Sequence, residues 1–182
     1  MFHDNTARGT DSGERAFGGA IATRPGTVDD SGSLTTIESS LLVANLAIGA
    51  DGGAGPFGAE AGGGALYNFD STLVTGSCIL LENEAGGGNG DTRGGNASGG
   101  AIFAWATGAN LTELVQIRRC QFSRNFAVAG SPGSEIGGQA LGGALHNASF
   151  SRMDLRQSTI SGNGALGGQD GRGVGGGLYT LG

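Results

Sequence analysis

Cys78-Ile-Leu80-Leu-Glu-Asn83-Glu-Ala85, near the middle of the chain, is one of five copies of the same motif. In each copy a large apolar residue lies three positions before an Asn, and an Ala lies two positions after it. The Asn residues are Asn5, Asn45, Asn83, Asn125 and Asn163, so the copies are separated by 40, 38, 42 and 38 residues. Self-similarity at a fixed period of this length is typical of a solenoid, in which repeats stack along one axis.

A second motif alternates with the first. It reads Gly-Gly-Ala-Ile or a close variant, and its copies cover residues 18–21, 63–66, 99–102, 142–145 and 175–178. Two motifs in each repeat predict two structural rungs of about 20 residues, and therefore about nine rungs along the chain.

The pattern of apolar residues favours strands over helices. The chain contains 40 Gly, spread through every repeat, and each Gly inside a helix costs about 1 kcal/mol relative to Ala. Before each Asn motif the apolar residues alternate, as in Val115 and Ile117 or Leu73 and Thr75. Alternation with period two places these side chains on one face of a strand. Short strands between Gly-rich turns predict an all-β fold, a single-stranded parallel β-helix.

The recurring Asn predicts a ladder along this β-helix. Adjacent strands lie about 4.8 Å apart, so like positions stack and an Asn amide can bond both its own turn and the next rung. Asn also tolerates left-handed backbone angles. The alternative is that each Asn is a solvated turn residue. We expect Asn5, Asn45, Asn83, Asn125 and Asn163 to form the structural ladder.

These two motifs together resemble the polymorphic outer-membrane-protein type of repeat, a right-handed parallel β-helix of bacterial surface and secreted proteins, including autotransporter passengers. Phe2-His-Asp-Asn5 and Phe122-Ser-Arg-Asn125 match the family's Phe-x-x-Asn motif strictly, and residues 18–21 and 99–102 match its Gly-Gly-Ala-Ile motif strictly. The other copies are conservatively varied. The resemblance covers essentially the whole chain and implies an extracellular or cell-surface, outer-membrane-associated bacterial protein.

Composition excludes some partners. The 182 residues carry a net charge of −6, which argues against nucleic acid, because nucleic-acid-binding domains carry a basic footprint. No apolar run approaches the 18 or so residues of a membrane span. Because the chain opens inside an Asn motif, we expect residues 1–182 to be one β-helix domain from a longer protein, with signal peptide, caps and anchor outside it. Its first partner would then be the rest of its own chain.

The two cysteines, Cys78 and Cys120, lie at equivalent positions of neighbouring repeats. With two rungs in each repeat, they would lie about 9.6 Å apart. A disulfide needs a Cα separation below about 7 Å. We therefore expect two buried thiols.

The loops between the motifs contain carboxylates, at Asp11, Glu14, Asp51, Glu60, Asp91, Glu135 and Asp170. The stretch ending at Asp91 is similar to a calcium-binding nonapeptide, but its Asp comes one residue early and no tandem follows. Calcium needs six to eight converging oxygen ligands, so calcium in these loops is the minor alternative. The adjacent Asp29-Asp30 pair does not provide two carboxyls across a cleft, as glycoside hydrolysis requires. We expect no catalytic, cofactor-binding or metal-ligating residue.

One further row follows the Gly-Gly motif. If the Ile or Leu of that motif points inward, the next residue points outward, which gives a row of Tyr67, Phe103, His146 and Tyr179 after Ala22. This row is a candidate contact surface for sugar rings or for another protein, and the alternative is that it only shields neighbouring rungs.

These observations predict a non-catalytic bacterial surface or secreted β-helix segment that acts as a rigid spacer or an adhesin-like passenger. Its external partner would be a surface glycan or a protein of a host or neighbouring cell. The alternative is a carbohydrate-active enzyme of the pectate lyase or polygalacturonase kind, or a sugar-binding module, on the same fold.

Overall fold

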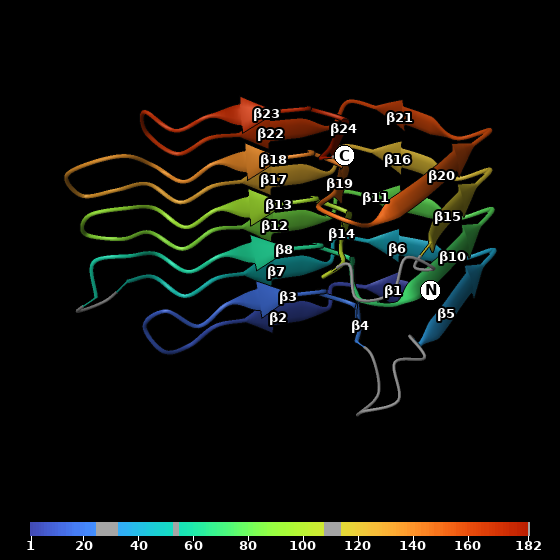
Figure 1. The fold of residues 1–182 in the computed structure, drawn as a ribbon, viewed down its shortest axis with the longest axis horizontal. Helices are drawn as coiled ribbons and strands as arrows, with labels where there is room; N and C mark the ends of the chain where they lie inside the picture. Colours follow the sequence, from blue (N-terminus) through green and yellow to red (C-terminus); the bar gives the residue numbers. More distant parts are fainter. Residues whose placement is uncertain (25–32, 53–54, 108–113, 182) are drawn as a thin grey trace.

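The computed structural model describes residues 1–24, 33–52, 55–107 and 114–181. Within these residues the secondary structure consists of short strands and turns, without helices. None of the described segments is therefore a helix that could cross a membrane. The strands stack in parallel as a β-solenoid, and Figure 1 shows the coils rising from the blue N-terminal end to the red C-terminal end.

One turn of the solenoid takes a whole repeat. Leu80 pairs with Leu42 of the preceding repeat and with Phe122 of the following repeat, so residues about one period apart lie on adjacent strands. The chain makes about four full turns and part of a fifth. Coil 1 covers residues 2–38, coil 2 residues 41–76, coil 3 residues 79–118 and coil 4 residues 121–156, and the incomplete coil 5 covers residues 159–180. The predicted division into two rungs per repeat is wrong, because the two motifs form different corners of the same coil.

Five parallel sheets run along the solenoid, one for each strand position in the coil. Sheet 1 contains β1 (Phe2–His3), β6 (Leu41–Val43), β11 (Ile79–Leu81), β16 (Gln121–Ser123) and β21 (Thr159–Ser161). Sheet 2 contains β2 (Thr6–Arg8), β7 (Leu46–Ile48), β12 (Glu84–Gly86), β17 (Phe126–Val128) and β22 (Gly164–Leu166). Sheet 3 contains β3 (Ala16–Phe17), β8 (Ala61–Gly62), β13 (Ala97–Ser98), β18 (Ala140–Leu141) and β23 (Gly173–Val174).

The two remaining sheets complete each coil. Sheet 4 contains β4 (Ile21–Thr23), β9 (Leu66–Phe69), β14 (Ile102–Trp105), β19 (Leu145–Asn147) and β24 (Leu178–Thr180). Sheet 5 contains β5 (Leu34–Glu38), β10 (Thr72–Gly76), β15 (Leu114–Arg118) and β20 (Arg152–Arg156). The predicted alternation is confirmed in sheet 5, where Val115 and Ile117 are fully buried and Leu73 and Thr75 nearly so.

The solenoid has two compartments with different cores. Sheets 1, 4 and 5 form the body, and they enclose large side chains such as Leu80, Ile102 and Phe122. Sheets 2 and 3 with their connecting loops form the wing, which projects to the left in Figure 1. Only small side chains lie between the two sheets of the wing, among them Ala47, Ala85 and Ala127. The Ala of the Asn motif is therefore required where the two sheets of the wing lie closest.

The Gly-Gly motif forms the corner where the wing joins the body. Its first Gly has a positive φ, 63° at Gly63, which other residues rarely adopt. Its second Gly lies against the residue that follows the ladder Asn: a Cβ at Gly64 would collide with the carbonyl group of Glu84. The corner therefore needs glycine at both positions, for two different reasons.

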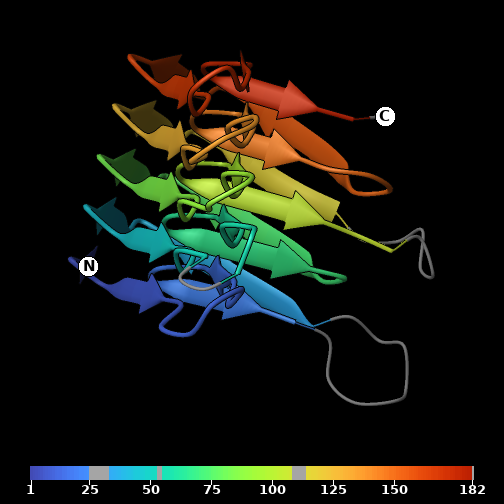
Figure 2. The same ribbon diagram turned by 90° about the vertical axis from the view of Figure 1, so that its left-hand side faces the viewer.

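Loops rich in Gly extend the wing on the side away from the body. Each loop has an outgoing strand-like segment after sheet 2 and a returning segment before sheet 3. Backbone hydrogen bonds join these two segments within a coil and also join each coil to the next. Gly88 N donates to Ala59 O (2.9 Å), Gly95 N to Gly88 O (2.8 Å) and Gly130 N to Gly95 O (2.9 Å). Figure 2, which faces the wing, shows these loops stacked in a column. The loops emerge along one edge, as predicted, and they are tied together by regular hydrogen bonding.

Candidate functional site

The predicted ladder is present on the corner between sheets 1 and 2. Both the backbone N–H and the Nδ2 of Asn83 donate to Oδ1 of Asn125 (3.0 and 2.9 Å). Asn45 donates to Asn83 Oδ1 in the same way (3.0 and 2.8 Å), and Asn83 Nδ2 also donates to Leu42 O (3.0 Å). Asn5 and Asn163 continue the pattern at the two ends. The ladder fully satisfies the buried Asn83 amide, which defines its role as structural.

The left-handed backbone lies one residue earlier than predicted. Positive φ occurs at the residue before each ladder Asn, for example at Ala44, Glu82 and Arg124. The Asn side chain therefore does not relieve its own backbone strain, and its recurrence is explained by the hydrogen bonds of the ladder.

The predicted aromatic row exists as a file of stacked rings on sheet 4. The ring centroids of Tyr67 and Phe103 are 5.6 Å apart, those of Phe103 and His146 are 5.0 Å apart, and those of His146 and Tyr179 are 5.2 Å apart. Phe17 of sheet 3 stacks on Tyr67 at 4.5 Å. Tyr67 and His146 are buried. Phe103 and His146 lie nearly parallel, with 18° between the ring planes, whereas the Tyr67–Phe103 and His146–Tyr179 pairs are tilted by 42° and 51°. A ligand role for this row stays a prediction, but any such contact is limited to the partly exposed edges of Phe103 and Tyr179.

His146 is the unusual member of this row. It is 3% exposed, and neither ring nitrogen has a hydrogen-bond partner among the described residues. Burial lowers the pKa of His146 to about 4. The imidazole is therefore neutral at pH 7 and behaves as one more flat ring of the stack.

Several loop carboxylates bond protein donors, and they do not converge on one point. Asp51 accepts the backbone N–H of Asn89 (2.7 Å), and Glu14 accepts the N–H of Thr10 (2.8 Å). These backbone bonds lower the pKa of Glu14. In the described part of the chain no three His, Cys, Asp or Glu side chains gather as metal ligands do. Asp29 and Asp30 lie outside the described residues.

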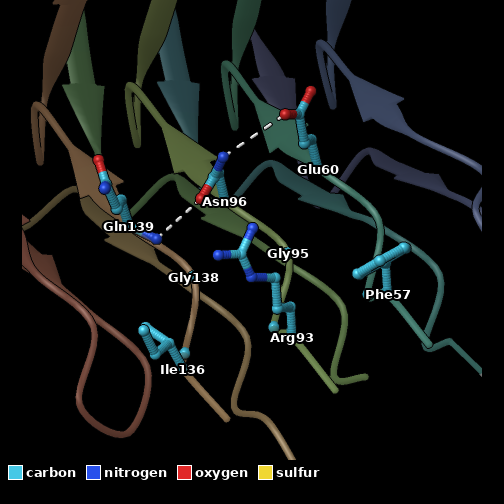
Figure 3. A pocket seen from close by; sticks show the side chains of 11 residues that line it. Phe57, Glu60, Arg93, Gly95, Asn96, Ile136, Gly138 and Gln139 are labelled. Carbon is cyan, nitrogen blue, oxygen red and sulfur yellow. Dashed lines mark hydrogen bonds between the residues drawn. The ribbon is translucent and has the colours of Figure 1, made fainter. Parts of the chain in front are cut away.

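A groove of about 320 Å³ lies on the outer face of the wing and crosses three consecutive coils. One wall is a row of Phe57, Arg93 and Ile136, which pair in register as isolated bridges. The other wall is a row of polar side chains, Glu60, Asn96 and Gln139. Figure 3 shows the two rows along the groove, with backbone between them. We take this groove as the candidate functional site.

The floor of the groove is bare backbone, because the wing cannot accept side chains there. Gly95 and Gly138 occupy equivalent positions in neighbouring coils. A Cβ at Gly95 would collide with the carbonyl oxygen of Ala59, and a Cβ at Gly138 would collide with that of Gly95. The close stacking of the loops therefore requires glycine, and the absence of side chains leaves a channel between the two walls.

The polar wall is a second, exposed ladder. Asn96 Nδ2 donates to Glu60 Oε1 (3.5 Å), and the backbone N–H of Gln139 donates to Asn96 Oδ1 (2.8 Å). Arg15 lies 3.4 Å from Glu60, so the carboxylate is ion-paired as well. These contacts fix Glu60 and Asn96 along the groove, and the Gln139 amide and one Asn96 N–H remain for a ligand.

The opposite wall is amphipathic. Phe57 and Ile136 are 56% and 51% exposed, so they present apolar surface to the groove. Arg93 stands between them, and its charge is partly neutralised by Glu135 at 3.9 Å. Apolar surface facing amide groups suits a ligand with both hydroxyl groups and apolar faces. Among the residues that the structure describes, Glu60 is the only carboxylate lining the groove, whereas glycoside hydrolysis ordinarily uses two across the scissile bond.

The groove has a signal in the sequence that the Asn and Gly-Gly motifs do not reveal. The three loops read Phe57-Gly-Ala-Glu60, Arg93-Gly-Gly-Asn96 and Ile136-Gly-Gly-Gln139, a bulky residue and a polar residue separated by two small residues. This motif was hidden because the loops differ in length and were aligned only from the Asn motif. Counting backwards from the start of sheet 3 brings the three tetrapeptides into register.

Comparison with protein-family models, with curated proteins and with solved structures gave no match.

Proposed function

We propose that this chain is a non-catalytic segment of a bacterial surface or secreted protein, in which a rigid β-helix presents an adhesive groove. The groove on the wing is the observation that carries this proposal, because it is built from the same two positions in three consecutive coils. A site of this kind offers contacts repeated at the rise of one coil, about 4.8 Å. Such spacing suits an extended chain that lies along the solenoid axis.

The favoured ligand is a neutral glycan chain. Asn96 and Gln139 offer amide groups to hydroxyls, and Phe57 and Ile136 offer apolar surface to the faces of sugar rings. A polyanion is a poor fit, because Arg93 is paired with Glu135 and the chain carries a net charge of −6. The same features support a surface location, where the partner is a glycan of the same or a neighbouring cell.

We also propose a family and a handedness for the coil. We place the chain with the polymorphic outer-membrane-protein repeats, on the basis of its two alternating motifs and of the parallel coil in which each motif has a fixed corner. Such a coil is right-handed, because connections between parallel strands are right-handed in about 98% of cases.

The test is a glycan-array screen of the 182-residue chain and two double variants. Asn96→Ala/Gln139→Ala removes the amides of the groove, and Gln116→Ala/Gln121→Ala removes two amides from the body as the matched control. We expect binding to neutral glycans that the groove variant weakens at least tenfold, about 1.4 kcal/mol, while the control binds as the wild type does. Absence of binding would leave the rigid-spacer role, and equal loss in both variants would place the binding site elsewhere.

The enzymatic alternative is tested on the same glycans. A hydrolase or lyase would release new reducing ends or unsaturated products with time, and Glu60→Gln would abolish that release. We expect bound glycans to be recovered intact from both proteins, because the groove holds a single, ion-paired carboxylate.

A further inference from the structure

Cys78 and Cys120 are direct neighbours in the solenoid, in contrast to the separation expected from two rungs per repeat. They immediately precede β11 and β16, which pair in register through Ile79 and Gln121. The backbone N–H of Gln121 donates to Cys78 O (2.8 Å), so the two coils contact each other at this point. Both cysteines are buried, with 1% and 2% exposure, and both are free thiols in this structure.

The two side chains also point the same way. The Cys78 thiol donates to the carbonyl oxygen of Gly76 (3.2 Å), two residues earlier, and the Cys120 thiol donates to that of Arg118 (3.3 Å). Ser40 and Ser158 fill the same slot in the coils below and above, and each hydroxyl makes the equivalent bond, to Glu38 O and Arg156 O. Ser40, Cys78, Cys120 and Ser158 therefore form one column along the solenoid. All four side chains bond the carbonyl oxygen two residues earlier, so they point in the same direction.

The geometry lies within reach of a covalent bond. Neighbouring strands are about 4.8 Å apart, and disulfides form at Cα separations of about 4.4–6.8 Å. The close approach of the two thiols lowers the pKa of Cys120 and, together with burial, raises that of Cys78.

We propose that Cys78 and Cys120 form an intramolecular disulfide that joins coils 3 and 4 when the chain folds in an oxidising compartment. The oxidant is a small-molecule disulfide. The Cys120 thiolate attacks it and releases one thiolate, and the Cys78 thiolate then displaces the second. The two cysteines together lose two electrons and two protons, and the oxidant becomes two thiols. Because both sulfurs are buried in the folded chain, the bond forms during folding and resists reductants afterwards.

The test uses the 182-residue chain, reduced and unfolded in urea, then refolded with oxidised and reduced glutathione or with dithiothreitol. Each sample is unfolded again with iodoacetamide, and its intact mass counts the alkylated cysteines. We expect no alkylation in the glutathione sample and two alkylated cysteines in the dithiothreitol sample. The glutathione sample should also melt ~5–10 °C higher, because the bond closes a long loop in the unfolded chain.

Cys78→Ser and Cys120→Ser are the matched controls, since serine already occupies this slot in coils 2 and 5. Each should melt at the same temperature in both redox samples. A chain exported to the bacterial periplasm provides a readout without refolding, and it too should resist alkylation. Two alkylated cysteines, two glutathione adducts or a disulfide-linked dimer in the oxidised samples would overturn the proposal.

Discussion

A histidine with two buried ring nitrogens and no hydrogen-bond partner is a costly residue to keep in a folded protein. Leaving a buried polar group unpaired costs about 1–3 kcal/mol. In His146 this cost is offset by ring stacking, because Phe103 lies at 5.0 Å and nearly parallel to the imidazole, and Tyr179 lies on the other side. The imidazole ring stabilises the aromatic row by packing, whereas its two unpaired nitrogens lower the stability of the folded chain.

His146→Phe should therefore stabilise the chain and remove part of its acid sensitivity. The pKa of His146 is lowered from 6.5 to about 4 in the folded chain. Between these two pH values the imidazole is therefore protonated in the unfolded chain and neutral in the folded chain. Stability is fully present above pH 6.5 and falls as the pH decreases towards 4, by up to about 3 kcal/mol. We expect urea unfolding of the variant to show a flatter profile between pH 7 and pH 4.

The matched control for this prediction is Tyr179→Phe, which changes the neighbouring ring and keeps the imidazole. It should retain the slope of the wild type below pH 6.5. An unchanged slope in His146→Phe would mean that other groups cause the loss of stability in acid.

At the scale of the element, the sequence predicted the strands well and their arrangement in the coil only in part. Alternation in residues 114–118 identified β15, and the recurring Asn identified the ladder, because both depend on local spacing. The number of rungs could not be obtained in this way. Two motifs per repeat are compatible with two rungs or with two corners of one rung, and only the pairing of Leu80 with Phe122 decides between them.

The wing escaped prediction for a related reason. Its sheets are separated only by Ala side chains, and its loops are ordered by backbone hydrogen bonds such as Gly95 N to Gly88 O. Neither feature produces an apolar pattern in the sequence. Gly-rich loops without such a pattern are normally assigned as irregular, so the groove between Arg93 and Asn96 could not be located from composition.

Gly95→Ala tests whether close packing holds the wing together. The added Cβ would collide with the carbonyl oxygen of Ala59 in the neighbouring coil, which forces the loops apart. Overpacking of this kind typically costs about 1–3 kcal/mol. We expect the urea midpoint to decrease accordingly and glycan binding at the groove to decrease with it.

Gly86→Ala is the control, because Gly86 has space for a Cβ. Its nearest neighbour would lie 3.7 Å from the new Cβ, an ordinary contact, and Gly86 is not among the positive-φ glycines. The substitution should be neutral, or stabilising by about 0.4–1 kcal/mol through the unfolded state. Equal destabilisation by both substitutions would contradict the role given to close packing.

At the scale of the whole molecule, the solenoid is a one-dimensional stack in which each coil contacts only its neighbours. Stability is then roughly a sum over coils and the interfaces between them. Coils 2, 3 and 4 are covered on both sides, and large, fully buried side chains of the core lie in all three, for example Leu42, Leu80 and Phe122. Coil 5 pairs on one side only within the described residues, and its Leu178 is 39% exposed.

The same substitution should therefore have different costs along the ladder. Asn83→Ala removes an amide that accepts two hydrogen bonds and donates to Asn125 and Leu42 in a fully buried setting, so we expect a loss of about 2–4 kcal/mol. Asn163 Oδ1 also accepts two hydrogen bonds, both from Asn125, but Asn163 is half-buried and its Nδ2 makes one bond, to Phe122 O, where Asn83 makes two. Asn163→Ala should therefore cost less, about 1–2 kcal/mol. Urea unfolding measures both losses, and hydrogen exchange should show slower amides in coils 2 to 4 than in coil 5. Equal costs at the two positions, or uniform exchange along the chain, would mean that the solenoid unfolds as a single unit. Such a result would contradict a stability that is a sum over coils and their interfaces.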